Sequence, residues 1–144
     1  MKRILVSMVI VLTSLASLKA DDRPVTFAQL PMAAQTFINA NYPDDKVSFA
    51  TVDDDVFRPD YQVALAGGVM IQFNHDGSLE KIETRSGNIP DGIIPVLIVE
   101  AVKGYYPDAK ILEYEVGRRS YEVKLSNRIE LKFNTRFNVM EIDN

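Results

Sequence analysis

The amino-acid sequence predicts an α+β fold of two tandem repeats, each a helix packed on an antiparallel β-meander of about four strands. The first observation is an internal duplication: residues about 24–86 recur in residues about 88–144. The offset is 64 at first and then falls to 60, because the first copy holds four extra residues. The second observation is that the hydrophobic period changes within each copy from 3.6 residues to 2.

Residues 1–20 are predicted to be a secretory signal peptide, because a positive start and an apolar run over residues 4–12 precede small residues. Cleavage is expected after Ala20, with cleavage after Ala16 as the alternative. The apolar run is short for a membrane span, although an uncleaved anchor is the other interpretation. The remaining residues, 21–144, are expected to form a single domain. The predicted location is the periplasm, with secretion or the cell surface as alternatives.

Charge and cysteine content limit the classes of partner and chemistry. Removing the leader takes away three of the 16 basic residues and none of the 20 acidic ones, which changes the net charge from −4 to −7. Nucleic acids and anionic membranes attract basic surfaces, so we expect no nucleic-acid partner and no membrane insertion after cleavage. The chain has no cysteine, which excludes disulfides, thiol catalysis and thiolate metal sites. Its stability must therefore come from a hydrophobic core.

Each copy opens with a predicted helix. Apolar residues recur at helical spacing from Leu30 to Ile38 and again from Ile94 to Tyr105. A proline lies near the first turn of each helix and another follows its end, where proline restricts the preceding residue to extended geometry. These prolines are Pro31 and Pro43 in the first copy, and Pro95 and Pro107 in the second. The tyrosine before each terminal proline, Tyr42 or Tyr106, is expected to pack at the helix end.

After each helix, apolar and polar residues alternate with a period of two, which predicts strands separated by turns. Whether the two meanders join in one sheet stays open at this point. The expected strands are Val47–Val52, Tyr61–Leu65, Val69–Phe73 and Leu79–Thr84 in the first copy, and Ile111–Val116, Tyr121–Leu125, Ile129–Phe133 and Phe137–Asp143 in the second.

A helix that ends in Tyr-Pro-Asp, a Tyr-x-Val-x-Leu strand and a strand that ends in Phe-Asn together resemble the PepSY-like family. Its members are β-lactamase-inhibitor-like proteins exported by Bacteroidetes. The resemblance implies a sheet that clasps a protein partner and a periplasmic or cell-surface address. No functional residue is carried over, because the family's motif residues are core and turn positions. The carrying segments are Leu30–Asp44 with Tyr61–Ile82, and Ile94–Asp108 with Tyr121–Ile142.

No residue pattern in the chain predicts a reaction, a cofactor or a metal site, so we expect a protein that is not an enzyme. His75 is the only histidine and lies in a predicted turn, where a solvated role is expected. Asp53, Asp54 and Asp55 resemble a calcium ligand cluster only in composition, because the spacing and the glycine of a known calcium loop are absent. A hydrolase that uses two carboxylates is one alternative interpretation of the function, although no particular pair of acidic residues is singled out.

The candidate site is the part of the first copy that differs from the second. If the apolar residues of two neighbouring strands face the helix, the opposite face carries Gln62, Ala64, Met70 and Gln72. The equivalent residues of the second copy are all charged, namely Glu122, Lys124, Glu130 and Lys132. The four extra residues lengthen the loop of residues 53–60, which contains Phe57 and Arg58, and these two residue types are common at binding hot spots.

These observations predict a binding domain that recognises a protein or peptide partner through this sheet face and the adjoining loop, with inhibition of that partner as a further expectation. The alternative function is a periplasmic small-molecule or metal-ion binding protein. For the face itself, the alternative is that the chain's own linker or termini cover it.

Overall fold

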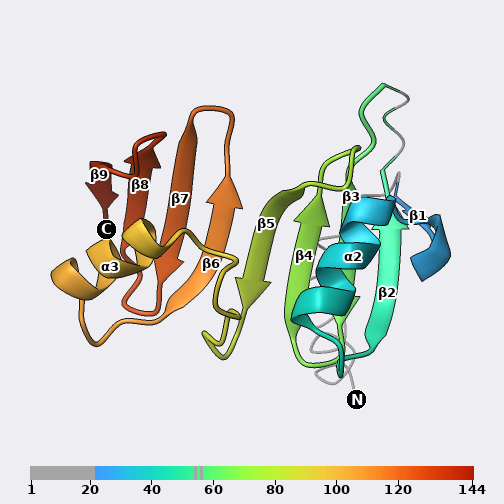
Figure 1. Cartoon of the computed structure of the whole chain (residues 1–144), viewed down its shortest axis with the longest axis horizontal. Helices are drawn as coiled ribbons and strands as arrows, with labels where there is room; N and C mark the ends of the chain where they lie inside the picture. The colour runs from blue at the N-terminus through green and yellow to red at the C-terminus, as the bar shows by residue number, and fades with distance from the viewer. Residues whose placement is uncertain (1–21, 54, 56) are drawn as a thin grey trace, which may run out of the picture.

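The computed structural model describes residues 22–144 except 54 and 56, so the predicted signal peptide lies outside the described residues. Nine strands form one antiparallel sheet whose spatial order follows the chain from β1 to β9 (Figure 1). The strands are β1 (Arg23–Pro24), β2 (Val47–Val52), β3 (Tyr61–Leu65), β4 (Val69–Phe73), β5 (Leu79–Thr84), β6 (Ile111–Val116), β7 (Ser120–Leu125), β8 (Glu130–Asn134) and β9 (Val139–Asp143).

The fold class predicted from the sequence is wrong. The described residues are not divided into two units of helix and meander; they form one continuous nine-stranded sheet with two α-helices, and the architecture is mostly β. Pairing of β5 with β6, through Lys81 with Glu115, Ile82 with Tyr114 and Glu83 with Glu113, makes the sheet continuous. The physical reason is that separate meanders would leave edge strands with unpaired backbone groups in the middle of the molecule.

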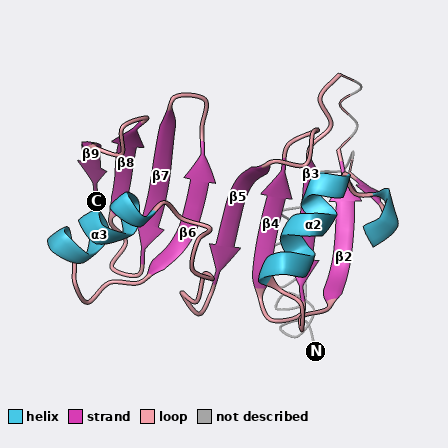
Figure 2. Ribbon diagram, viewed as in Figure 1, coloured by secondary structure: helices cyan, strands magenta, loops and turns pink. Residues whose placement is uncertain are grey.

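Both α-helices lie on the same face of the sheet, which we call the helix-bearing face (Figure 2). They are α2 (Met32–Asn41) and α3 (Val96–Tyr105), preceded by a short 3-10 helix, η1 (Phe27–Gln29). Pro31 and Pro95 occupy the N-cap positions, and Tyr42 and Tyr106 occupy the C-cap positions. Both tyrosines pack against the core, which confirms the helix-end packing predicted for them.

Equivalent turns of the two copies adopt the left-handed conformation with glycine in the first copy and with residues that carry a side chain in the second. Gly68 and Gly77 have φ angles of 88° and 86° in the turns that flank β4. In the turns that flank β8, Arg128 and Phe137 have φ angles of 71° and 64°. Residues with a side chain lose roughly 1–2 kcal/mol in this left-handed region. Phe137 therefore belongs to a turn, and the last strand begins two residues later than predicted.

One hydrophobic core lies between the sheet and the two helices. Its side chains come from α2 and α3 and from both halves of the sheet, and they form a single cluster. Phe73 and Phe133, at equivalent positions of β4 and β8, are both fully buried. The Phe73 ring also contacts Phe37 of α2 edge-on, with the ring centroids 5.6 Å apart.

We expect Phe73→Ala and Phe133→Ala each to lower the free energy of unfolding by about 3–5 kcal/mol, since each removes a fully buried aromatic side chain. Because the core is one cluster within one sheet, both variants should shift the same cooperative transition in urea, followed by circular dichroism. Two separate transitions, each sensitive to only one substitution, would contradict a single folding unit.

Candidate functional site

The face of the sheet opposite the helices, which we call the open face, contains the residues that the sequence singled out. Gln62 lies directly across from Gln72, and Ala64 from Met70, on strands β3 and β4. Their sequence neighbours Val63 and Ile71 are fully buried in the core. Since successive side chains of a strand point to opposite faces, the four residues share the open face.

Strand β2 extends this group with two residues that sequence comparison missed. Phe49 pairs with Ala64, and Thr51 pairs with Gln62. Phe49 is 40% exposed, whereas Thr51 and Ala64 are buried. The same comparison of the two copies could have found them, because an offset of 64 aligns these uncharged β2 residues with the charged residues Glu113 and Glu115. We define the uncharged patch as Phe49, Thr51, Gln62, Ala64, Met70 and Gln72.

The loop of residues 53–60, which contains Phe57 and Arg58, connects the end of β2 to the start of β3 at one end of the sheet (Figure 1). Phe57 is 89% exposed. The Asp55 carboxylate accepts hydrogen bonds from the backbone N–H groups of Phe57 and Arg58, at 3.0 Å and 3.3 Å. This side chain therefore has a structural role in the loop.

Asp53 organises the base of the same loop. Its carboxylate accepts hydrogen bonds from the backbone N–H groups of Asp55 and Asp60, at 3.2 Å and 3.1 Å. Asp54, the middle residue of the aspartate run, lies outside the described residues. His75 lies exposed in the turn between β4 and β5.

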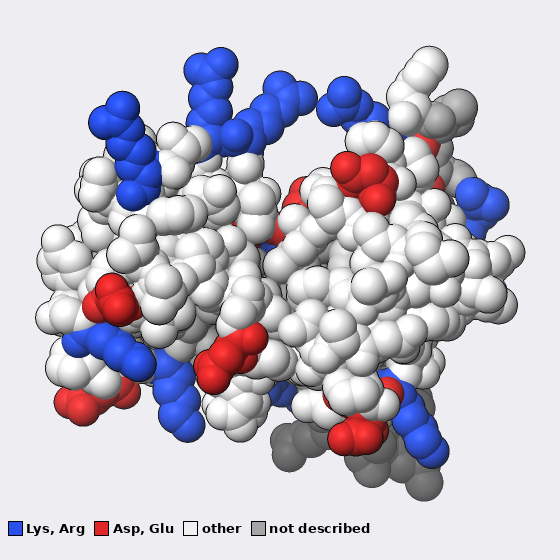
Figure 3. Space-filling view, viewed as in Figure 1, with Lys and Arg blue, Asp and Glu red and all other residues white. Residues whose placement is uncertain are grey.

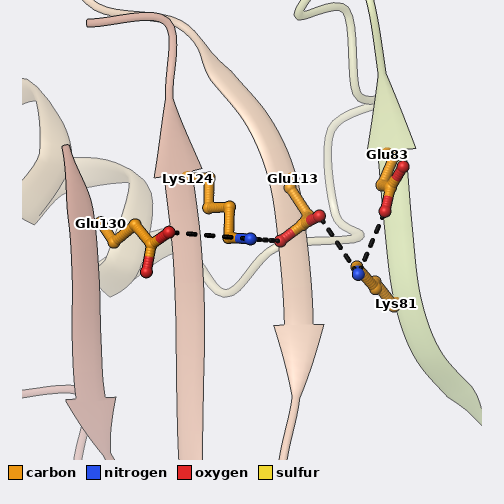
Figure 4. A network of polar contacts seen from close by, with 5 residues as sticks. All are labelled: Lys81, Glu83, Glu113, Lys124 and Glu130. Carbon is orange, nitrogen blue, oxygen red and sulfur yellow. Dashed lines mark ion pairs between the residues drawn. The ribbon is translucent and has the colours of Figure 1, made fainter. Parts of the chain in front are cut away.

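The open face of β5–β8 carries a chain of ion pairs, in contrast to the uncharged patch (Figure 4). Lys81 Nζ lies 3.1 Å from the Glu83 carboxylate and 3.3 Å from the Glu113 carboxylate. Lys124 Nζ lies 3.3 Å from the other Glu113 oxygen and 3.6 Å from the Glu130 carboxylate. One of them, between Lys81 and Glu113, crosses the junction between β5 and β6, so a side-chain interaction reinforces the backbone pairing there.

The two glutamates at this junction are expected to differ in acidity. Burial first, and then a hydrogen bond with Glu83, raises the pKa of Glu113 above its ordinary value despite the nearby lysines. Burial also disfavours the ionised form of Glu83, but hydrogen bonds with Lys81 and Glu113 outweigh it and lower the pKa of Glu83.

The helix-bearing face is the other candidate binding surface, besides the open face. Figure 3 shows that its charged side chains lie mainly towards the margins. Met32, Val96, Leu97 and Tyr105 are more than half exposed on the two helices. A cavity of about 510 Å³ lies beside α3, and its lining includes Ile89, Ile94, Val99 and Ile111. This size and apolar lining suit part of a small molecule or an apolar side chain.

An acidic pocket of about 200 Å³ adjoins the uncharged patch, with Asp53, Asp60 and Glu80 among its lining residues. Burial first, and then the negative charges of Asp60 and Glu115, raises the pKa of Glu80. Among the residues that the structure describes, no three acidic or histidine side chains converge closely enough to hold a metal ion.

The chain belongs to the PepSY-like family. The family model described as "putative beta-lactamase-inhibitor-like, PepSY-like" matches residues 17–57 and 59–141. The resemblance recognised in the sequence is thereby confirmed. No curated protein matches the sequence.

Three solved structures are similar over nearly their whole length. A Bacteroides thetaiotaomicron protein described as a "putative calcium-regulated periplasmic protein" is 40% identical, with a TM-score of 0.81 and coverage of 86% of this chain and 98% of its own. A Bacteroides vulgatus protein described as a "putative periplasmic protein" is 39% identical, with a TM-score of 0.81 and coverages of 88% and 100%. A second B. vulgatus periplasmic protein, of unknown function, is 27% identical, with a TM-score of 0.80 and coverages of 85% and 99%.

The relatives confirm the periplasmic location predicted from the sequence. Within the described part of the chain, no helix has the length and apolar character needed to cross a membrane. The family description is inhibitor-like, and the descriptions of the relatives name no reaction.

We expect the Glu113 carboxyl to keep its proton to a higher pH than the Glu83 carboxyl, as measured by carbon-detected NMR titration. Because the pKa of Glu113 is higher in the folded than in the unfolded protein, its protonation stabilises the fold. This contribution is complete at a pH below the pKa of the unfolded state and is lost as the pH rises through the pKa of the folded state. The lowered pKa of Glu83 acts in the opposite direction, with stability lost as pH falls through the folded pKa. In Glu83→Gln, Glu113 should titrate at a lower pH; an unchanged titration would show that the two groups are independent.

Proposed function

We propose that this periplasmic protein binds a protein or peptide partner through the uncharged patch, with the loop of residues 53–60 as a second contact. The observation that carries the proposal is the contrast between two equivalent regions of one sheet. Every residue of the patch is uncharged, whereas the equivalent positions of the second half carry Glu113, Glu115, Glu122, Lys124, Glu130 and Lys132.

The contrast matters because both regions have the same strand pairing and differ only in side chains. A solvated sheet face is ordinarily covered by cross-strand charge pairs, such as Glu122 with Lys132. The uncharged patch offers Met70 and Phe49 together with amide groups, which a partner can cover without removing a charge from water. Phe57 and Arg58 have the residue types that anchor interfaces, and their position beyond the patch suits contact with a partner larger than the patch.

The inhibitor-like description of the family supports inhibition as the consequence of binding. A rigid sheet face can block a partner's own site simply by covering it, and this requires no catalytic group. The proposal therefore assigns no reaction to this chain and identifies the occupant of the patch as a macromolecule.

The test places charges at two positions of the patch with Gln62→Glu and Met70→Lys, a variant without change in net charge. Met70 lies opposite Glu83, so the new lysine gains a favourable neighbour. The free energy of unfolding should therefore change by less than about 0.5 kcal/mol per site, and the melting temperature should change little. Recovery of specific partners from periplasmic extract by the immobilised protein should be lost, as measured by quantitative mass spectrometry.

Two controls locate the effect. Glu122→Gln with Lys132→Gln removes an equivalent charge pair from the second half and should leave recovery unchanged. Leu97→Glu alters the helix-bearing face, and loss of recovery in that variant alone would place the partner on the other side of the sheet. A large fall in stability of the patch variant would show that the patch is internally covered.

Calcium binding is a second candidate function, and it is the metal-ion form of the alternative predicted from the sequence. It is supported by the relative described as calcium-regulated and by the acidic pocket next to the uncharged patch. Calcium takes six to eight oxygen ligands, and the pocket offers the carboxylates of Asp53 and Glu80 and the amide oxygen of Gln72. Because the described carboxylates do not converge, calcium binding at this pocket requires them to move closer together.

If calcium binds there, titration calorimetry should show heat of binding, and millimolar calcium should raise the melting temperature by mass action. Glu80→Gln should weaken both effects, whereas Glu100→Gln, an equivalent change on the exposed surface of α3, should not. No heat and no thermal shift at millimolar calcium would exclude this function.

A further inference from the structure

The outer edge of β9 is the one long strand edge that no described strand covers. β9 is the last strand of the sheet, and among the described strands it pairs only with β8. Met140 and Ile142 on this strand are 60% and 45% exposed. An edge strand presents a row of backbone N–H and C=O groups, and with exposed apolar side chains it is a template for another strand.

The opposite edge of the sheet is protected. Strand β1 pairs with β2 through Arg23 with Val52 and Pro24 with Thr51. The backbone N–H of Val25 donates a further hydrogen bond to the Ala50 carbonyl, at 2.9 Å. β1 is only two residues long and contains a proline, which are two ordinary means of blunting an edge. The two ends of the sheet are therefore built differently.

The chain also contains a template for the missing neighbour of β9. β9 pairs with β8 in the same register as β5 pairs with β4, including a bulge at Met140 that is equivalent to one at Glu80. In β5, the three residues after the bulge bind β6 in antiparallel orientation. The equivalent residues of β9 are Glu141, Ile142 and Asp143. A bulge at this position thus does not prevent a further strand from pairing.

The charges of β9 determine which strand fits. Lys81 of β5 forms ion pairs with Glu83 and Glu113, and the equivalent residue of β9 is Glu141. The strand opposite β5 is Glu113-Tyr114-Glu115, an acidic, aromatic and acidic triplet. With Glu141 and Asp143 flanking Ile142, the complementary triplet has basic residues on both sides of an apolar one.

A second copy of this chain does not meet these requirements. Antiparallel pairing of two β9 strands centred on Ile142 would place Glu141 of one copy opposite Asp143 of the other, and like charges directly opposite are destabilising. The β2 edge of a second copy is already occupied by β1 at Ala50 and Thr51. A strand of a different protein, with basic residues on both sides of an apolar one, therefore fits β9 better than a second copy of this chain does.

We propose that β9 binds an extended segment of a second protein by antiparallel strand addition, and that this segment carries a basic-apolar-basic triplet. The basic side chains lie on the open face, opposite Glu141 and Asp143, and the apolar one packs beside Ile142 on the helix-bearing face. The main-chain hydrogen bonds supply affinity and the alternating side chains supply selectivity. This site is at the opposite end of the sheet from the uncharged patch and is independent of the function proposed there.

The test uses the protein purified from periplasm and a capped synthetic peptide, Thr-Val-Lys-Tyr-Lys-Val-Thr. NMR should show binding with slowed hydrogen exchange of β9 backbone amides. A peptide with glutamate in place of both lysines should bind about tenfold more weakly, because two favourable cross-strand pairs become unfavourable. Two further peptides carry N-methyl groups at alternate backbone nitrogens, one peptide at the odd positions and the other at the even positions. Each blocks hydrogen bonding along one edge of the peptide strand, so only the peptide whose blocked edge faces β9 should lose binding.

Variants then assign the contact to β9. Glu141→Lys with Asp143→Lys should reverse the preference in favour of the glutamate peptide. Asp44→Lys with Asp91→Lys makes the same change in net charge at exposed positions outside α3, β8 and β9 and should preserve it. The patch variant Gln62→Glu with Met70→Lys should also bind the basic peptide normally, which separates this inference from the proposed function. Absence of peptide binding, binding without protection of β9 amides, or self-association that protects β9 would each overturn the proposal.

Discussion

The pairing of β5 with β6 is the interaction on which the rest of the structure depends. Three residue pairs join what would otherwise be two meanders, and the resulting sheet has one core and one uninterrupted open face. The ion pair of Lys81 with Glu113 crosses the same junction, and Lys124 extends it from Glu113 to β7. Because the sheet is continuous across this junction, the uncharged patch and the charged half lie side by side on the open face, and the proposed partner of the patch would meet the border of the charged half.

Sequence periodicity predicted the helices, most strand boundaries and the shared face of Gln62, Ala64, Met70 and Gln72, because alternation reports directly on which face a side chain occupies. It could not predict the continuous sheet, since pairing between strands is set by backbone groups that every residue carries. Phe49 and Thr51 were missed for a different reason: the comparison of the two copies stopped at β3 and β4. The turn at Phe137 was missed because aromatic residues ordinarily favour strands.

The relatives show that this arrangement tolerates extensive change in side chains. The TM-score is 0.81 at 40% identity and 0.80 at 27% identity, so the backbone is kept while most residues differ. Such tolerance is expected of a core that needs apolar residues of suitable volume more than particular ones. Selectivity for the proposed partner must then come from the surface, where the two halves of this chain differ in charge.

The short strand β1 has a consequence for the self-association of the molecule. The β5–β6 junction is a head-to-tail contact between two similar halves, and such contacts generate open filaments when both ends are available. With β9 bare, the β2 edge is the end at which a chain of copies would otherwise propagate. Arg23 and Pro24 cover that end, so we expect this short strand to disfavour the growth of such a chain of copies.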